Sequence, residues 1–155
     1  MRPDRGPDPG PQLAQVAIPS RDVLLDTGPL VAALNARDQW HAACLEQWPE
    51  LIARCVTTEA VLTEACHLVA RAGAAPQLPV DFTLAAGIPI VSLDHPAHKR
   101  VSTLMEKYAS VPMDYADATL VAVAEALSIK TVFTLDRRGF RAYRIGGSGR
   151  FTILP

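Results

Sequence analysis

Short apolar runs alternate along this chain with longer amphipathic segments. Residues 23–25 are branched and apolar and lead into Asp26-Thr27-Gly28-Pro29, a pattern typical of a buried parallel strand followed at once by a helix. The same pattern returns at residues 131–135, which are followed by Asp136. Further strands are predicted at residues 52–57, 88–93 and 151–154. The chain therefore supplies several short strands with helices between them.

Helical periodicity fills the segments between these strands. In residues 59–70 the apolar side chains fall at i, i+1, i+4, i+7 and i+8, the pattern of a helix with one buried face. These side chains are Val61, Leu62, Ala65, Leu68 and Val69. Another helix is predicted from Tyr115 to about Leu127, and shorter ones from Pro29, from His41 towards Pro49 and after Asp94. This alternation predicts an α/β fold: a three-layer α/β/α sandwich around a mostly parallel sheet.

Four acidic residues lie where this fold would bring them together. Asp26 and Asp136 each follow a predicted strand, and the carboxyl ends of parallel strands form the edge of the sheet where ligands bind. Asp117 shares the helix face of Leu120 and Val121, and Glu64 lies at the edge of a buried stripe. We therefore expect the carboxylates of Asp26, Glu64, Asp117 and Asp136 to converge on one rim.

Each acid except Glu64 also has a purely structural explanation. Asp26 and Asp136 could cap the helices that follow them, and Asp114-x-x-Asp117 imitates a capping box. Glu64 lies in the middle of a helix and caps nothing. Asp114 lies one turn before Asp117 on the same side of the helix, and is a competing candidate for the third acid of the site.

Several carboxylates in one place point to a divalent cation. Like charges close together raise one another's pKa, and an ion bound by oxygen ligands removes the conflict. Mg²⁺ and Mn²⁺ prefer carboxylate and water ligands, and such ions assist attack of water on phosphorus. The hydroxyls of Thr27 and Thr134, beside the strand-end acids, could bond a carboxylate or a metal-bound water. The pattern predicts metal-assisted hydrolysis of a phosphodiester.

A group of arginines follows Asp136. Three of them, Arg137, Arg138 and Arg141, are candidates for binding phosphate beside the acids. The formal net charge of the chain is −1, so any contact with nucleic acid must come from a local patch of this kind. The alternative explanation is that these arginines form an ordinary solvated face.

The composition is that of a single globular domain and argues against disulfide-rich, zinc-binding and membrane-spanning proteins. The chain has 155 residues, 49% of them hydrophobic, and its three cysteines form no Cys-x-x-Cys pair. A disulfide framework and a zinc knuckle are thereby disfavoured, and a cytoplasmic location is expected. No apolar run is long enough for a bilayer, so no membrane contact is expected. Residues 1–20 are rich in proline and glycine and are expected to form a disordered leader.

Four motifs in order resemble the PIN domain family, in the subgroup similar to VapC-type ribonuclease toxins. They are Leu25-Asp26-Thr27-Gly28, Thr63-Glu64-Ala65, Asp114-Tyr115-Ala116-Asp117 and Thr134-Leu135-Asp136. The resemblance covers residues 23–154, so residues 22–155 are expected to form a PIN-like nuclease domain. The long leader before Asp26 and the additional acid Asp114 depart from the family pattern.

The resemblance implies an endoribonuclease that depends on Mg²⁺ or Mn²⁺. Carried over residue by residue, it makes Asp26, Glu64, Asp117 and Asp136 the catalytic quartet, with Asp26 and Asp117 as direct metal ligands. It further implies a single-stranded or structured RNA substrate, a cognate antitoxin protein and a homodimer. Asp117 is preferred over Asp114 because it shares the buried helix face.

Two other functions stay open at this point. A non-catalytic PIN-like binding module could use the same acids to hold a partner's basic side chain or a structural ion. A housekeeping nuclease that processes RNA would share the chemistry but not the toxin role. A receiver-like domain phosphorylated on Asp26 is disfavoured, because Lys130 precedes the last long strand instead of following it.

Overall fold

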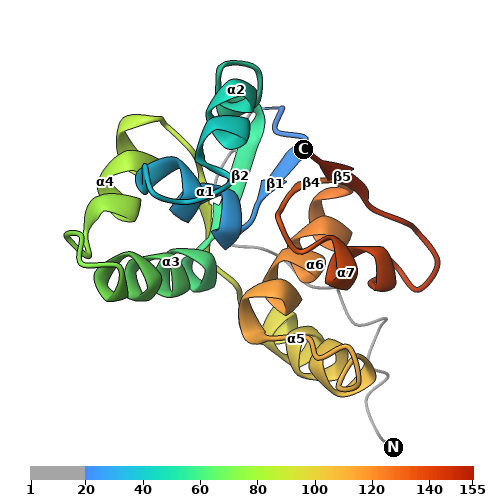
Figure 1. Cartoon of the computed structure of the whole chain (residues 1–155). Coiled ribbons are helices and arrows are strands. Elements are labelled where there is room, and N and C mark those ends of the chain that lie inside the picture. Colours follow the sequence, from blue (N-terminus) through green and yellow to red (C-terminus); the bar gives the residue numbers. More distant parts are fainter. Residues whose placement is uncertain (1–19) are drawn as a thin grey trace, which may run out of the picture.

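The computed structural model describes residues 20–155 (Figure 1). Five strands form one sheet in the order β3-β2-β1-β4-β5, and every neighbouring pair is parallel. The strands are β1 (Val23–Leu25), β2 (Cys55–Thr58), β3 (Ile90–Val91), β4 (Thr131–Phe133) and β5 (Thr152–Leu154). The predicted disordered leader at residues 1–20 lies, apart from its last residue, outside the described residues.

Strand β1 lies at the centre of the sheet although it comes first along the chain. Val23 pairs with Cys55 of β2 on one side and with Thr131 of β4 on the other. The chain builds β2 and β3 outward in one direction and then crosses to place β4 and β5 on the opposite side of β1. The strand order therefore reverses between β1 and β4, and in open α/β sheets ligands bind in the crevice at such a point.

Helices occupy the segments between the strands. They are α1 (Thr27–Leu34), α2 (His41–Leu51), α3 (Glu59–Arg71), α4 (Leu78–Ala85), α5 (His95–Lys107), α6 (Tyr115–Leu127) and α7 (Arg137–Ala142). The predicted long helices α3 and α6 are thus confirmed within one residue at each end. Thr58 caps α3 by accepting a hydrogen bond from the backbone of Val61, and Asp94 caps α5 in the same way from Ala97. These caps fix where each helix begins.

Two apolar cores lie on opposite faces of the sheet. Leu24 packs with buried side chains of α5, α6 and α7, whereas its neighbours Val23 and Leu25 pack with those of α1, α2 and α3. This alternation follows from the period of two residues along a strand. The result is the expected three-layer α/β/α sandwich, with an entirely parallel sheet (Figure 1). No helix in residues 20–155 combines the length and apolarity that crossing a membrane requires.

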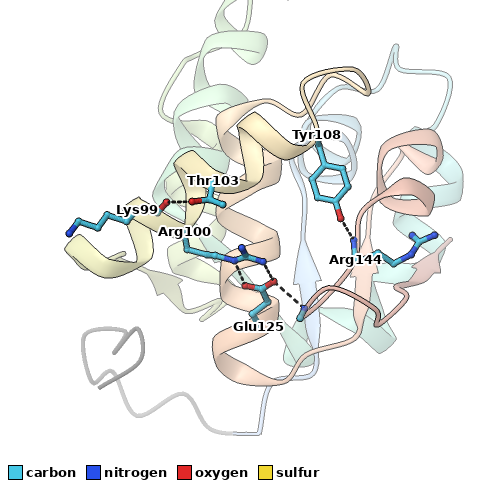
Figure 2. Close-up of polar contacts among 7 residues, drawn as sticks. Lys99, Arg100, Thr103, Tyr108, Glu125 and Arg144 are labelled. Carbon is cyan, nitrogen blue, oxygen red and sulfur yellow. Dashed lines mark hydrogen bonds and ion pairs between the residues drawn. The ribbon is translucent and has the colours of Figure 1, made fainter. Parts of the chain in front are cut away.

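Helices α5 and α6 are joined by an ion pair and continue into the loop after α7. Nε and one terminal nitrogen of Arg100 each donate to the Glu125 carboxylate at 2.8 Å, and Glu125 also accepts a bond from the backbone of Gly146 (Figure 2). The Tyr108 hydroxyl accepts a bond of 3.0 Å from the backbone of Arg144 (Figure 2). These contacts hold α5, α6 and the loop from α7 to β5 as one unit.

Several predicted element bounds were wrong. The segment Ile52–Arg54 is a 3-10 helix instead of the start of a strand, and the strand predicted at residues 88–93 is reduced to Ile90–Val91. Pro89 has no backbone N–H to donate, so the edge strand cannot extend back through it. Helix α2 runs through Pro49, because burying Trp48 and Leu51 in the core outweighs the hydrogen bond that proline removes.

The buried face predicted for α3 was wrong at one position. Leu68 is 37% exposed, whereas Val61, Leu62, Ala65 and Val69 are buried. Leu68 lies one turn after Glu64 and lines the same pocket. The side chain therefore faces the opening of the site and not the core.

Candidate active site

Asp26 lies at the point where the strand order reverses. Its backbone N–H continues the sheet by donating to the Phe133 carbonyl at 3.0 Å, and its side chain is only 6% exposed. Oδ1 accepts a hydrogen bond of 2.7 Å from the backbone of Thr27, and Oδ2 accepts one of 2.6 Å from the Thr134 hydroxyl. The aspartate thus ends β1, caps α1 and holds its carboxylate in a fixed orientation.

The two threonines beside the strand-end acids both bind carboxylates. Thr134 is fully buried, donates to Asp26 and accepts a hydrogen bond of 2.9 Å from the backbone of Asp136. Thr27 donates to Oε2 of Glu64 at 3.2 Å. Together they connect the ends of β1 and β4 with α3.

Asp114 and Asp117 lie one turn apart at the start of α6. Asp114 is the helix cap: its Oδ1 accepts a bond of 2.8 Å from the backbone of Asp117. Asp117 is 8% exposed, and its Oδ2 accepts a bond of 2.8 Å from the Tyr143 hydroxyl. Asp114 therefore caps the helix, and the Asp117 carboxylate is oriented by Tyr143 instead of completing a capping box; the roles of both acids in catalysis stay predictions.

Tyr143 is a site residue that the sequence analysis missed. It is fully buried in the core that packs against α6 and follows α7 directly. It lies 26 residues after Asp117. No periodicity or motif connects two residues at that separation, so only the folded structure could pair them.

Asp136 caps α7 and requires a glycine nearby. Its Oδ1 accepts a hydrogen bond of 3.0 Å from the backbone of Gly139. A Cβ atom placed on Gly139 would lie 2.3 Å from Oδ2 of Asp136 and 2.9 Å from the Tyr143 hydroxyl. The absence of a side chain at Gly139 therefore makes room for two residues of the site.

One pocket of about 180 Å³ collects these residues. Its lining consists of Asp26, Thr27, Gly28, Glu64, Leu68, Asp114, Asp117 and Asp136. The structure thus brings together all four acids of the predicted quartet, and the competing acid Asp114 as well. Their individual roles in catalysis stay predictions.

The predicted phosphate-binding arginines are not part of this lining. Arg137, Arg138 and Arg141 lie on α7 with exposed side chains. Arg137 donates to the backbone carbonyl of Pro155. The three residues begin immediately after Asp136, so they flank the pocket without lining it, and their contact with phosphate stays a prediction.

Burial and mutual repulsion raise the pKa of the acids in the pocket. Burial raises the pKa of Asp26 to about 6, against the hydrogen bonds from Thr134 and Thr27, while the charges of Glu64 and Asp114 raise it further. Burial raises the pKa of Asp117 to about 8, assisted by the charges of Asp26 and Asp114. Burial also raises the pKa of Glu64. Ionising all of these groups together is therefore costly without a positive charge among them.

The donor set fits a small divalent cation that keeps part of its water shell. One oxygen each of Glu64, Asp114, Asp117 and Asp136 accepts no hydrogen bond from the described residues and is available to a ligand. Within residues 20–155, no three acidic, histidine or cysteine side chains form a preassembled metal cage. Mg²⁺ commonly binds through one or two carboxylates and several waters, so it requires no such cage.

The sequence matches the model of one protein family and is similar to one ribonuclease along that protein's whole length. The model of the PIN domain matches residues 23–146. Ribonuclease VapC26 of Mycobacterium tuberculosis (strain ATCC 25618 / H37Rv) is 33% identical over 135 residues, which are 86% of this chain and 100% of that protein.

Solved structures share the fold. Mycobacterium tuberculosis VapC20, described as a sarcin-ricin loop cleaving toxin, has a TM-score of 0.69 at 20% identity, over 74% of this chain and 90% of that one. VapBC2 from Rickettsia felis, solved bound to a DNA fragment from their promoter, has a TM-score of 0.60 at 16% identity, over 86% of this chain and 98% of that one. The family model covers most of the chain and the ribonuclease is matched along its whole length, so this protein belongs to the PIN domain family.

Proposed function

We propose that this protein is a VapC-type endoribonuclease that hydrolyses RNA phosphodiester bonds with Mg²⁺ or Mn²⁺ held by Asp26 and Asp117. The observation that carries this proposal is the pocket at the reversal of the strand order, where five carboxylates from four separate segments meet. Two further observations support it, namely membership of the PIN domain family and 33% identity to a ribonuclease along that protein's whole length.

Each acid of the predicted quartet has a role in this mechanism. A bound divalent ion supplies charge neutralisation and activates water for attack on phosphorus. Asp26 is oriented by Thr134, and Asp117 by Tyr143, so that both would hold the ion when it is bound. Glu64, oriented by Thr27 through Oε2, leaves Oε1 to accept the proton of the attacking water. Asp136 orients water on the β4 side of the pocket.

The partners follow from the same proposal. One protein of the same fold, from Klebsiella pneumoniae, is a toxin-antitoxin complex. We expect this chain likewise to bind a cognate antitoxin and to act as a homodimer in the cytoplasm. Arg137, Arg138 and Arg141 would contact RNA phosphates beside the pocket, giving affinity without sequence preference.

The test replaces Asp26 with asparagine, which keeps the size of the side chain and removes its charge. The Asp26→Asn variant is expected to cleave RNA in Mg²⁺ at least about 100-fold more slowly, because a lost metal ligand removes several kcal/mol of transition-state stabilisation. Asp94→Asn is the matched control, since Asp94 also caps a helix but does not line the pocket. Circular dichroism checks that both variants fold.

Two results would contradict the proposal. Cleavage by Asp26→Asn at the wild-type rate would exclude the metal site. No cleavage by the wild type in Mg²⁺ or Mn²⁺, together with tight binding to a protein partner, would instead favour the non-catalytic module. Growth arrest on overexpression, relieved by a co-expressed antitoxin, separates a toxin from a housekeeping nuclease.

A further inference from the structure

Two stacked rings belong to the α5–α6 pair, one of them next in the chain to an acid of the pocket, and they take no part in the mechanism above. Tyr115 of α6 and His98 of α5 have ring centroids 6.4 Å apart and planes inclined by 20°. Tyr115 directly follows Asp114, which lines the pocket. An aromatic surface therefore begins one residue from the acids.

The Tyr115 side chain does not pack in the apolar core. Its side chain is 45% exposed, whereas the next five residues of α6 are all buried. The other large apolar side chains with comparable exposure, among the described residues, are Trp40, Leu45, Leu68 and Leu84. Of these only Leu68 lines the pocket, whereas Tyr115 is an exposed aromatic residue whose chain neighbour Asp114 lines it.

The two rings are held in place before any ligand binds. The His98 ring is hydrogen-bonded at 2.8 Å between Nδ1 and the Asp94 carbonyl oxygen. Helix α5 is locked to α6 by the two contacts between Arg100 and Glu125 (Figure 2). A ligand that stacks on this pair therefore loses little entropy in ordering the protein.

The positive charge of Lys99, the residue after His98, favours an anionic strand. The first two turns of α5 carry the exposed residues His95, His98 and Lys99. Lys99 extends away from Arg100 and Glu125 (Figure 2) and has no ion-pair partner among residues 20–155. Single-stranded nucleic acids bind where aromatic rings and basic side chains occur together, because bases stack on the rings and phosphates meet the cations.

We propose that Tyr115, backed by His98, stacks a base of the nucleotide next to the scissile phosphate. This proposal rests on the proposed function, since it requires RNA in the acidic pocket. The stack holds the strand on the α5 side of the pocket, whereas the arginines that follow Asp136 contact it on the β4 side. Tyr115 is thus a positioning residue, which acts on binding and not on the chemical step.

The experiment measures cleavage of an RNA oligomer that carries a site mapped with the wild type on total bacterial RNA. Tyr115→Ala is expected to raise KM about 5- to 150-fold, the effect of losing one stacked base, with kcat nearly unchanged. Tyr115→Phe keeps the ring and is expected to behave as wild type. Trp40→Ala is the control, because Trp40 is similarly exposed at 46% and neither it nor its chain neighbours line the pocket.

A second arm removes the base instead of the ring. Oligomers with one abasic nucleotide on either side of the cleavage site are tested against the wild type and Tyr115→Ala. The abasic position that raises the KM of the wild type is expected to cause no further rise in the KM of Tyr115→Ala, because both changes break the same contact.

The outcomes separate the two proposals. Wild-type KM in Tyr115→Ala, or additive effects of the two changes, overturns the stacking proposal and leaves the nuclease intact. A change in the oligomeric state of Tyr115→Ala in size-exclusion chromatography also overturns it, since the ring would then belong to a protein interface. Absence of RNA cleavage by the wild type overturns the proposed function itself.

Discussion

The hydrogen bond from Thr134 to Asp26 determines how the central carboxylate is presented. It is 2.6 Å long and joins two buried side chains. This hydroxyl and the Thr27 N–H oppose the effect of burial on the pKa of Asp26, which still rises to about 6. Hydrogen bonds to a charged group are the strong ones, so Thr134 is central to keeping Asp26 ionised and oriented.

We predict that Thr134→Val lowers kcat/KM about 10- to 100-fold, the usual effect of removing a side chain that orients a metal ligand. The free energy of unfolding is expected to fall by about 1–3 kcal/mol, because the Asp26 carboxylate loses a partner inside the protein. Steady-state kinetics in Mg²⁺ and denaturant unfolding measure the two effects. Thr134→Ser keeps the hydroxyl and serves as control; an equal loss of kcat/KM in both variants would contradict the prediction.

At this scale the sequence could predict residues beside a strand end and the acids Glu64 and Asp117 on helix faces. Thr27 and Thr134 were identified because they flank Asp26 and Asp136, and both do bind carboxylates. Tyr143 and Gly139 were missed, since their importance comes from contacts with Asp117 and Asp136 that no local pattern encodes. The side chains that orient a site are set by tertiary packing, which a periodicity does not contain.

At the scale of elements, three helices begin at the acidic pocket. Asp26 caps α1, Asp114 caps α6 and Asp136 caps α7. The partial positive charge at a helix N-terminus favours carboxylates there. The structural explanation of these acids therefore does not compete with the proposed functional one, because each side chain caps a helix and also lines the pocket.

We predict that Asp114→Asn separates the two roles at the start of α6. Asparagine caps helices about as well as aspartate, so the free energy of unfolding is expected to change by less than about 0.5 kcal/mol. RNA cleavage is expected to fall much less than in Asp117→Asn, because Asp117 is the proposed metal ligand. Anomalous density from a crystal soaked in Mn²⁺ gives an independent result, and an ion bound by Asp114 instead of Asp117 would contradict the prediction.

We predict that Gly139→Ala disrupts the start of α7. The added Cβ would lie 2.3 Å from the carboxylate of Asp136 and 2.9 Å from the Tyr143 hydroxyl, so both side chains must move. Such overpacking typically costs about 1–3 kcal/mol of stability, and activity is expected to fall with it. The control Gly146→Ala lies outside the site; it strains the backbone, because Gly146 has a φ of 58°, but its Cβ meets nothing within 4 Å, so it lowers stability without displacing a site residue. Cleavage by Gly139→Ala equal to that of Gly146→Ala would show that the position of Asp136 is unimportant.

The elements themselves were predictable where the pattern was long. The periodicity of α3 and α6 extends over several turns and located both helices, whereas the two-residue strand β3 was predicted too long. The length of a short edge strand depends on how far its partner strand pairs with it and, here, on Pro89. Hydrophobicity alone shows neither effect. Leu68 was assigned to the core because an apolar residue at helical spacing has the same pattern whether it meets core or pocket.

At the scale of the whole molecule, the order of the strands concentrates negative charge. Placing β1 between β2 and β4 brings Asp26 next to Thr134 and Asp136, and α3 and α6 add Glu64 and Asp117. The sequence predicted a parallel sheet and a common rim for the acids, but not this strand order. Order depends on which strands pair across long separations, and a single sequence with short strands does not specify those pairings.

This concentration of charge predicts how the stability of the metal-free protein depends on pH. The pKa values of Asp26 and Asp117 rise to about 6 and about 8 in the folded state, from ordinary values near 3.8. The folded protein therefore holds protons that the unfolded chain has already released. Stability is highest below the unfolded pKa and falls as pH rises from about 4 to about 8. The melting temperature in EDTA is expected to decrease across this window.

A divalent cation should reverse this dependence, because it binds the ionised carboxylates and replaces the protons. At 100 times its dissociation constant, Mn²⁺ stabilises the folded state by about 2.7 kcal/mol, or about 5–10 °C in melting temperature for a chain of this size. The increase in melting temperature on adding Mn²⁺ should be largest near pH 8 and nearly absent at pH 5, where protons compete for the same carboxylate oxygens. In Asp117→Asn one charge is gone, so in EDTA at pH 8 this variant is expected to melt above the wild type and to respond only weakly to Mn²⁺. A melting temperature that stays constant in EDTA from pH 5 to 8, or a response to Mn²⁺ that is equal in Asp117→Asn, would mean that these carboxylates do not share an ion.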